Sequence, residues 1–262
     1  MTSARKTYII ANWKMNFTPG EASLYLNRLS RRIEPSRKVQ VILAPSLISL
    51  QSLSLQVNRR QFKLAAQNFY WRDFGAFTGE VAVSQLRGFV DYAIVGHSER
   101  RNIFGETDKE IAQKVAAAIR NGLTPILCIG EKDYERKAGE TALVIHEQLL
   151  NGLHEVSDED IDKVIIAYEP VWAISSSKNA RPAKPLDIQD AQKIIRDQIA
   201  KLYGKETAEN IPVLYGGSVC ADTASGYLDI PGIDGLLVGS ASLVGDSFCA
   251  IVEAAKGKED ER

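Results

Sequence analysis

Residues 92–129 read YAIVGHSERRNIFGETDKEIAQKVAAAIRNGLTPILCI, and this stretch holds one complete strand–helix–strand unit. It begins and ends with short apolar runs, Tyr92–Val95 and Thr124–Ile129. Both runs are continuous rather than alternating, which is typical of strands buried on both faces. Between them, Thr107 and Glu110 form a capping box before apolar residues at helical spacing. The stretch therefore predicts two parallel strands joined by a helix that covers the sheet.

The same alternation of apolar run and helical pattern recurs along the chain. The runs that we expect to form strands are Tyr8–Trp13, Val39–Ala44, Lys63–Gln67, Tyr92–Val95, Thr124–Ile129, Val164–Glu169, Ile211–Tyr215 and Gly235–Gly239. These units predict an α/β fold, a closed (β/α)8 barrel that fills residues 1–262 as a single domain. The alternative is an open doubly wound sheet, which normally carries a phosphate-binding glycine fingerprint after its first strand. This chain has Asn12-Trp13-Lys14-Met15-Asn16 there, so the barrel is favoured.

Composition and charge argue against several classes of protein. Of the 262 residues, 45% are hydrophobic and 25% charged, as in ordinary soluble globular proteins. The 32 basic and 33 acidic residues leave no basic excess for nucleic acid or for a membrane surface. No apolar run approaches the roughly 20 residues that span a bilayer, and Met1 to Lys6 lack the apolar stretch of a signal peptide. The three cysteines form no disulfide framework, so we expect a cytoplasmic protein with reduced thiols.

Polar residues gather where the predicted strands end, and in a barrel these ends share one rim where chemistry collects. They are Asn12, Lys14, Gly96-His97-Ser98-Glu99, Glu169, Gly216-Gly217-Ser218 and Gly239-Ser240. Taken singly, Glu169 could be a surface carboxylate, His97 a hydrogen-bonded core histidine and Lys14 a solvated charge. The glycine pair could be only a tight turn. Their convergence on one rim favours an active site instead.

This combination of groups has a chemical meaning. A carboxylate can remove a proton from a carbon next to a carbonyl group. An imidazole and an ammonium group can stabilise the oxygens of the resulting enediolate. Backbone N–H groups of glycine-rich turns can hold a phosphate. No cluster of Cys, His and carboxylate residues has metal-ligand spacing, so we expect no metal and stabilisation by the protein's own groups.

Five motifs connect this interpretation with a known family. They are Ala11-Asn12-Trp13-Lys14-Met15-Asn16, Gly75-Ala76-Phe77-Thr78-Gly79-Glu80, Gly96-His97-Ser98-Glu99-Arg100-Arg101, Ala167-Tyr168-Glu169-Pro170-Val171-Trp172-Ala173-Ile174 and Tyr215-Gly216-Gly217-Ser218-Val219. With these motifs in order, the chain resembles the triosephosphate isomerases from about Tyr8 to about Ala255. The resemblance implies reversible interconversion of dihydroxyacetone phosphate and D-glyceraldehyde 3-phosphate, in glycolysis and gluconeogenesis, with no cofactor and no metal.

The resemblance also implies roles for individual residues. Glu169 matches the catalytic base, His97 a neutral imidazole that acts as the electrophile, and Lys14 the cation near the substrate oxygens. The other matching positions are Asn12 as a substrate-binding amide, Ser98 and Glu99 as support for the histidine and lysine, and Gly217, Ser218, Gly239 and Ser240 as phosphate-binding turns. Many relatives have a second glycine at the place of Ser240, whose N–H is still available to a phosphate.

Two loops carry further expectations from the resemblance. It implies a homo-oligomer, which we expect to be a homodimer, in which Thr78 on the loop of residues 67–82 enters the partner's active-site region. It also implies a mobile lid over about residues 170–186, from which the N–H of Ser175 binds the phosphate. Here Ser175-Ser176-Ser177 replaces the usual Gly-Thr-Gly, and Asn179–Leu186 is a few residues longer than the usual connection. If one lid state needs a positive φ, a residue other than glycine costs roughly 1–2 kcal/mol.

Two other functions are alternatives to this one. The altered lid would suit a barrel that keeps a phosphate site but only binds or regulates, and the fold also carries other phosphosugar isomerases and epimerases. The latter typically use different base pairs or metals. Against a binding module, all the residues that the chemistry needs are present together: Asn12, Lys14, His97, Glu99 and Glu169.

Overall fold

The strands of this chain close into a barrel. The computed structural model describes residues 6–174 and 180–257. Within them, parallel strands pair in chain order and the last pairs with the first. The strands are β1 (Thr7–Asn12), β2 (Val39–Ala44), β3 (Phe62–Ala66), β4 (Tyr92–Val95), β5 (Thr124–Ile129), β6 (Ile165–Tyr168), β7 (Val213–Tyr215) and β8 (Gly235–Val238). Because β8 pairs with β1, the predicted barrel is confirmed and the open sheet is excluded.

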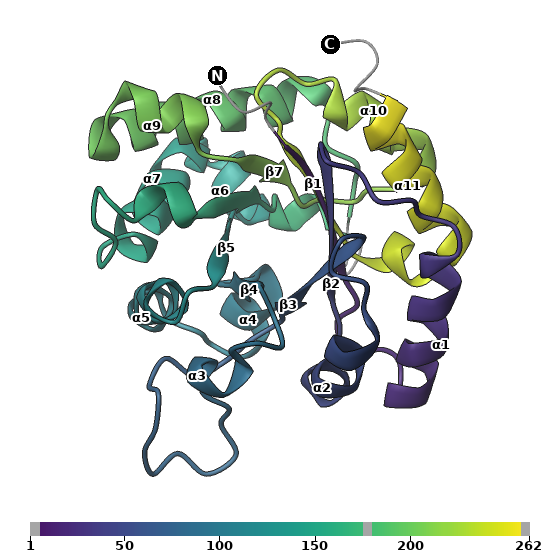
Figure 1. The fold of residues 1–262 in the computed structure, drawn as a ribbon. Coiled ribbons are helices and arrows are strands. Elements are labelled where there is room, and N and C mark those ends of the chain that lie inside the picture. Colours follow the sequence, from purple (N-terminus) through teal and green to yellow (C-terminus); the bar gives the residue numbers. More distant parts are fainter. Residues whose placement is uncertain (1–5, 175–179, 258–262) are drawn as a thin grey trace.

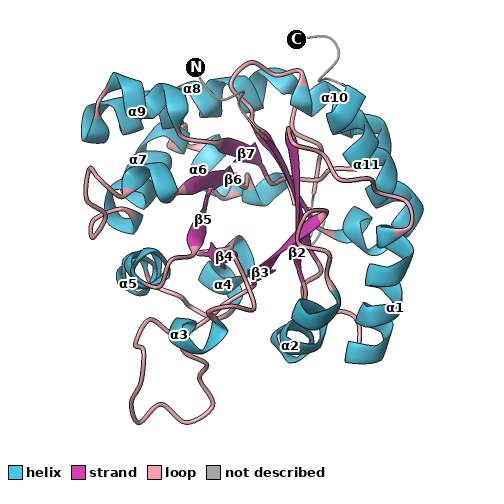
Figure 2. Cartoon of the chain, in the orientation of Figure 1, coloured by secondary structure: helices cyan, strands magenta, loops and turns pink. Residues whose placement is uncertain are grey.

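Helices surround the strands on the outside, as Figures 1 and 2 show. The helices are α1 (Pro19–Ser30), α2 (Leu47–Gln56), α3 (Val83–Leu86), α4 (Ser98–Ile103), α5 (Asp108–Arg120), α6 (Asp133–Lys137), α7 (Thr141–Gly152), α8 (Pro185–Tyr203), α9 (Lys205–Asn210), α10 (Ala221–Leu228) and α11 (Gly245–Gly257), with short 3-10 turns η1 (Ile161–Lys163), η2 (Val171–Ala173) and η3 (Ser240–Leu243). In the described part of the chain, none of the helices is long and apolar enough to cross a membrane.

The helix predicted from the capping box is α5. The hydroxyl oxygen of Thr107 accepts the N–H of Glu110 at 3.3 Å, and a carboxylate oxygen of Glu110 accepts the N–H of Thr107 at 2.8 Å. The apolar side chains Ile111 and Val115 are fully buried against the barrel. Local sequence therefore starts this helix, and burial of one face holds it in place.

Side chains of the strands alternate between two buried layers. In β1, Ile10 lies in the inner cluster, whereas Ile9 and Ala11 belong to the outer layer beneath the helices. The inner cluster consists of Ile10, Ile42, Ala44, Ala65, Ile94, Ile126, Cys128, Ile165, Ala167, Leu214 and Leu237. Apolar side chains thus fill the barrel, and polar groups are left to the rim where the strands end.

Candidate active site

The carboxyl ends of five strands bring the predicted polar residues together. Asn12 is the last residue of β1, and Glu169 comes directly after β6. His97 lies between β4 and α4, where it is the N-cap of the helix. With Lys14 and the turns after β7 and β8, these side chains line one small hollow of about 20 Å³. The structure therefore places them on one rim, as the sequence predicts.

Glu169 is held in a single position by buried contacts. Its side chain is almost fully buried, and one carboxylate oxygen accepts the N–H of Ser98 at 3.0 Å. The other lies 3.1 Å from Nε2 of His97. Burial raises the pKa of Glu169, but His97 and the Ser98 N–H lower it by more, so the carboxylate is ionised.

The backbone around Glu169 leaves no room for larger neighbours. A Cβ atom at Gly130 would lie 2.0 Å from the carbonyl oxygen of Glu169, and one at Gly216 would lie 2.8 Å from its Cγ. The N–H of Glu169 donates to the carbonyl of Ile129 at 2.7 Å. The ends of β5, β6 and β7 therefore fix where this carboxylate stands.

His97 has its tautomer set by the helix that it caps. Its Nδ1 accepts the N–H of Glu99 at 3.2 Å, so in the neutral ring the proton resides on Nε2, toward Glu169. Burial lowers the pKa of His97, but the carboxylates of Glu169 and Glu99 together raise it above its usual value. A ligand that moves Glu169 away would remove the larger of these two charges, and burial would then favour the neutral imidazole.

Lys14 stands in a strained turn after β1. Its φ of +52° lies in the left-handed region, which only Lys14 and Phe17 adopt among the described residues other than glycine. The N–H of Lys14 donates to Oδ1 of Asn12 at 3.1 Å, and its Nζ lies 2.6 Å from an oxygen of Glu99. Asn12 thereby holds the backbone of Lys14, and Glu99 holds its ammonium group, beside the hollow.

Gln67 is a supporting residue that the sequence analysis missed. Its amide nitrogen donates to the carbonyl oxygens of Lys14 at 2.9 Å and Ala44 at 2.8 Å. It follows β3, and so one side chain ties together the ends of three neighbouring strands. Nothing in the local pattern around Gln67 marks this role, because both partners are backbone atoms of distant segments.

The predicted phosphate turns lie beside Lys14. Gly217 and Ser218 follow β7, Gly239 and Ser240 follow β8, and all four line the small hollow. A Cβ atom at Gly239 would lie 3.6 Å from Cε of Lys14. The N–H of Ser218 donates to the carbonyl oxygen of Ala173 at 2.8 Å. One of the predicted phosphate donors is therefore bound to the protein's own η2 turn.

Two predicted contacts lie outside this cluster. Ser175, with the rest of Ser175-Ser176-Ser177, lies outside the described residues. Thr78 is exposed on the loop between β3 and α3, which extends away from the barrel (Figure 1). The structure does not bring Thr78 to the hollow of its own chain.

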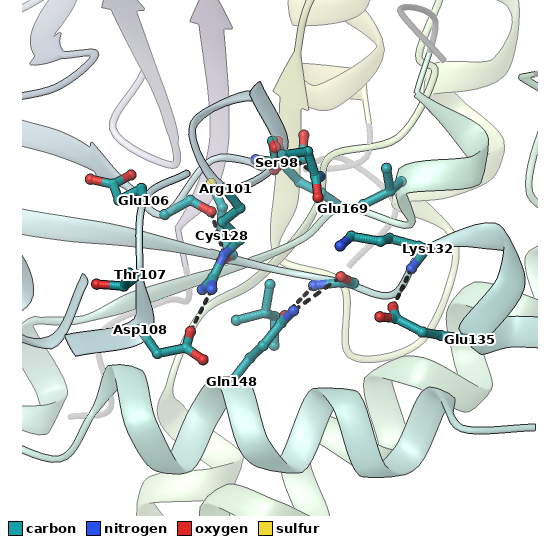
Figure 3. A pocket seen from close by; sticks show the side chains of 15 residues that line it. Ser98, Arg101, Glu106, Thr107, Asp108, Cys128, Lys132, Glu135, Gln148 and Glu169 are labelled. Carbon is teal, nitrogen blue, oxygen red and sulfur yellow. Dashed lines mark hydrogen bonds and ion pairs between the residues drawn. The ribbon is translucent and has the colours of Figure 1, made fainter. Parts of the chain in front are cut away.

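A second, larger hollow of about 250 Å³ is also lined by Glu169. Figure 3 shows polar side chains around it, including Arg101 and Gln148. Arg101 pairs with Asp108 at 2.6 Å, and Gln148 accepts the N–H of Gly130 at 2.7 Å. Asn12, Lys14 and His97 do not line this hollow, so the smaller one is the candidate substrate site.

Metal ligands do not gather at either hollow. Among residues 6–174 and 180–257, no three His, Cys, Asp or Glu side chains are grouped so that they could hold a metal ion. The groups available to stabilise negative charge at the small hollow are the Lys14 ammonium, the His97 imidazole and backbone N–H donors. This arrangement suits a phosphate-bearing substrate that gains an oxyanion during reaction.

Comparisons with a family model and with individual proteins point to the same family. The family model described as triosephosphate isomerase matches residues 7–255. The triosephosphate isomerase of Caldanaerobacter subterraneus subsp. tengcongensis is 43% identical over 249 residues, which cover 95% of this chain and 99% of that protein. That of Streptococcus mutans serotype c is 41% identical over 254 residues, covering 97% and 100%. That of Natranaerobius thermophilus is 39% identical over 252 residues, covering 96% of each.

Proposed function

The chain belongs to the triosephosphate isomerase family, and we propose that it interconverts dihydroxyacetone phosphate and D-glyceraldehyde 3-phosphate by proton transfer through an enediolate. The observation that carries this proposal is the placement of three groups around one hollow. Glu169 lies 3.1 Å from His97, and the ammonium of Lys14 lines the same space. This reaction gives the chain a place in glycolysis and gluconeogenesis.

Glu169 is the base in this mechanism. When substrate enters, the carboxylate leaves His97 and the Ser98 N–H, the groups that lower its pKa in the free protein. Burial then raises the pKa of Glu169 and makes it a stronger base. It takes a proton from the carbon next to the carbonyl, and the electron pair of that C–H bond moves to form the enediolate. Transfer of the hydroxyl proton from one enediolate oxygen to the other, and return of a proton to the neighbouring carbon, give the other triose phosphate.

His97 and Lys14 stabilise the oxygens of the enediolate. Because the Glu99 N–H occupies Nδ1 of His97, the proton on Nε2 can donate a hydrogen bond into the hollow. The ammonium of Lys14 supplies positive charge beside it, and Asn12 supplies an amide. Ser98 and Glu99 act indirectly: Ser98 binds Glu169 in the free protein, and Glu99 orients Lys14.

The phosphate is held by backbone donors. We assign this role to the N–H groups of Gly217, Ser218, Gly239 and Ser240, which follow β7 and β8 at the hollow, with the N–H of Ser175 added from the lid over residues 170–186. The Ser218 donor becomes available once the η2 turn releases it from Ala173. No metal or other cofactor takes part in any of these steps.

The protein acts as a cytoplasmic homodimer in this proposal. The loop of residues 67–82 carries Thr78 and the exposed side chain of Phe74 out from the barrel, and Met15 beside Lys14 is 96% exposed. Large apolar side chains exposed around a site are typical of contact surfaces. The three free cysteines suit a reducing compartment. Light scattering at micromolar concentration should give a dimer; a fully active monomer would contradict the role given to Thr78.

The decisive test is the rate of D-glyceraldehyde 3-phosphate isomerisation by the purified protein in the presence of a metal chelator. We expect kcat/KM near the diffusional range, about 10⁷–10⁸ M⁻¹s⁻¹. A rate several decades lower, with inorganic phosphate still bound, would mean that the chemistry is assembled but the lid is impaired. No rate and no phosphate binding in a folded protein would overturn the proposal.

A further inference from the structure

Charged residues surround the indole ring of Trp172 in the η2 turn. Some precede Trp172 in the sequence, and one follows it. The ring is 4% exposed, and its N–H donates to a buried carboxylate oxygen of Glu131 at 2.8 Å. The guanidinium carbon of Arg136 lies 4.2 Å from the ring centroid, and that of Arg181 lies 5.0 Å from it. Both guanidinium groups are attracted to the negative π face of the ring, so both hold Trp172 in place.

Each of these cations has an acidic partner that limits their mutual repulsion. Arg136 pairs with Asp187 at 2.7 Å, and Arg181 pairs with Asp133 of α6 at 3.1 Å. The side chain of Arg181 is half exposed, so its ion pair alone is worth little. Its contact with Trp172, by contrast, joins it to a buried aromatic ring.

The backbone of Arg181 also contacts the η2 turn. Its N–H donates to the carbonyl oxygen of Trp172 at 3.3 Å. Arg181 lies in the segment before α8, which begins at Pro185. This segment thus supplies a cation that contacts the ring of Trp172.

The η2 turn in turn occupies a phosphate donor. The residue after Trp172 is Ala173, whose carbonyl oxygen accepts the N–H of Ser218 at 2.8 Å. Under the proposed function, this N–H binds the substrate phosphate. Whatever holds Trp172 in its place therefore also keeps Ser218 bound to the protein itself.

We propose that Arg181 is a positioning residue for phosphate binding: by holding Trp172, it stabilises the state in which Ala173 occupies the Ser218 N–H. Ligand binding must then overcome this contact, because a ligand shifts a two-state equilibrium only by its differential affinity. The inference rests on the proposed function of Ser218. It predicts that weakening the Arg181–Trp172 contact strengthens the binding of phosphate compounds.

The test compares phosphate affinity in four proteins by calorimetry: the unchanged chain, Arg181→Lys, Arg181→Ala and Lys184→Ala. The probes are inorganic phosphate and glycerol 3-phosphate, which carries the phosphate but no carbonyl group. Arg181→Lys keeps the charge but loses the planar stacking surface. Lys184 is exposed three residues away, so Lys184→Ala measures the loss of one nearby positive charge. Thermal unfolding checks that each variant is folded.

We expect Arg181→Lys to bind both probes about two- to fivefold more tightly than the unchanged chain, the scale of one exposed cation–π contact. Arg181→Ala should bind them more tightly than Lys184→Ala by a similar factor. In the isomerase assay KM should fall with Kd, and Asp133→Asn, which removes the ionic partner of Arg181, should shift both in the same direction.

Equal or weaker phosphate binding by Arg181→Lys would overturn the inference, because Arg181 would then favour the ligand-bound state or neither state. The two proposals fail in different ways. If the unchanged chain has no isomerase activity, the proposed function is wrong and this inference is wrong with it. If the chain is active but its phosphate affinity does not change when Arg181 is replaced, only the inference is wrong.

Discussion

The two halves of the rim differ in how far they are prepared for substrate. On the side of β1, β4 and β6, Glu169, His97 and Lys14 already stand around the hollow with their partners in place. On the side of β7, the N–H of Ser218 is bound to Ala173 of the η2 turn. Under the proposed function, the chemical half is therefore built into the strand ends, whereas the phosphate half depends on release of Ser218 by the η2 turn. Changes to the first half should have large effects, and changes to the second should have small ones.

The largest expected effect comes from the carboxylate of the chemical half. Glu169→Gln removes the base and should reduce kcat by at least about 10³-fold. Glu147→Gln, an exposed position on α7, is the matched control and should leave kcat unchanged. Steady-state kinetics with both trioses measure the difference. A loss under tenfold in Glu169→Gln would show that the two halves do not differ in the way proposed here.

The pairing of Glu169 with His97 gives a pH-dependent test. Protonation of Glu169 removes the base, so kcat/KM falls as the pH drops through the pKa of this carboxyl in the free enzyme. His97 and the Ser98 N–H hold that pKa below its usual value. His97→Gln should lower kcat/KM by about 10²-fold. It should also move the acidic limb of the profile to higher pH, because burial then raises the pKa with less opposition.

The measurement is the pH profile of kcat/KM for the unchanged chain and for His97→Gln, limited to pH values at which circular dichroism shows both folded. An acidic limb at the same pH in both proteins would mean that His97 does not control the ionisation of Glu169. That result would be compatible with the electrophilic role of His97. It would contradict the electrostatic coupling between His97 and Glu169.

A supporting residue should have an intermediate effect. Gln67→Leu leaves the carbonyl oxygens of Lys14 and Ala44 without the donor that holds them. Each lost partner costs roughly 1–3 kcal/mol if the acceptor stays buried. We expect KM to rise about tenfold as the strained Lys14 turn relaxes, together with a lower melting temperature. Gln56→Leu, on the exposed face of α2, is the control. Unchanged KM in a destabilised Gln67→Leu protein would limit Gln67 to a structural role.

The strand ends could be predicted from the sequence, whereas the contacts between loops could not. Apolar runs predicted the eight strands seen in residues 6–174 and 180–257, because burial on both faces of a parallel sheet leaves a local pattern. The rim residues followed, since parallel strands place their carboxyl ends together. Glu169 and His97 could be placed near each other for this reason alone.

Contacts between loops left no such pattern. Gln67 binds backbone oxygens of Lys14 and Ala44, and the η2 turn binds Ser218 through a carbonyl group. Backbone acceptors are the same at every residue, so the sequence does not mark which ones are used. Trp172 stands in a recognisable motif, but its contact with Arg181 depends on the path of the chain before α8. The residues of the proposed phosphate half could therefore be predicted from the sequence, whereas the contacts that hold them could not.

A smaller effect than those of Glu169→Gln and His97→Gln is expected at the lid tip, where the sequence alone supports a prediction. Restoring glycine at Ser175 and Ser177 removes a penalty of roughly 1–2 kcal/mol if one lid state needs a positive φ, and so changes the balance of lid states by roughly five- to thirtyfold. In the double variant Ser175→Gly, Ser177→Gly, kcat or glycerol 3-phosphate affinity should change by that factor or less, and less substrate should be lost as methylglyoxal while the enediolate is held. Kinetics identical to those of the unchanged chain would show that the serines are conformationally neutral. The free-energy cost of preparing the phosphate half would then come from breaking the contact of the η2 turn with Ser218. The Arg181→Lys variant tests that contact separately.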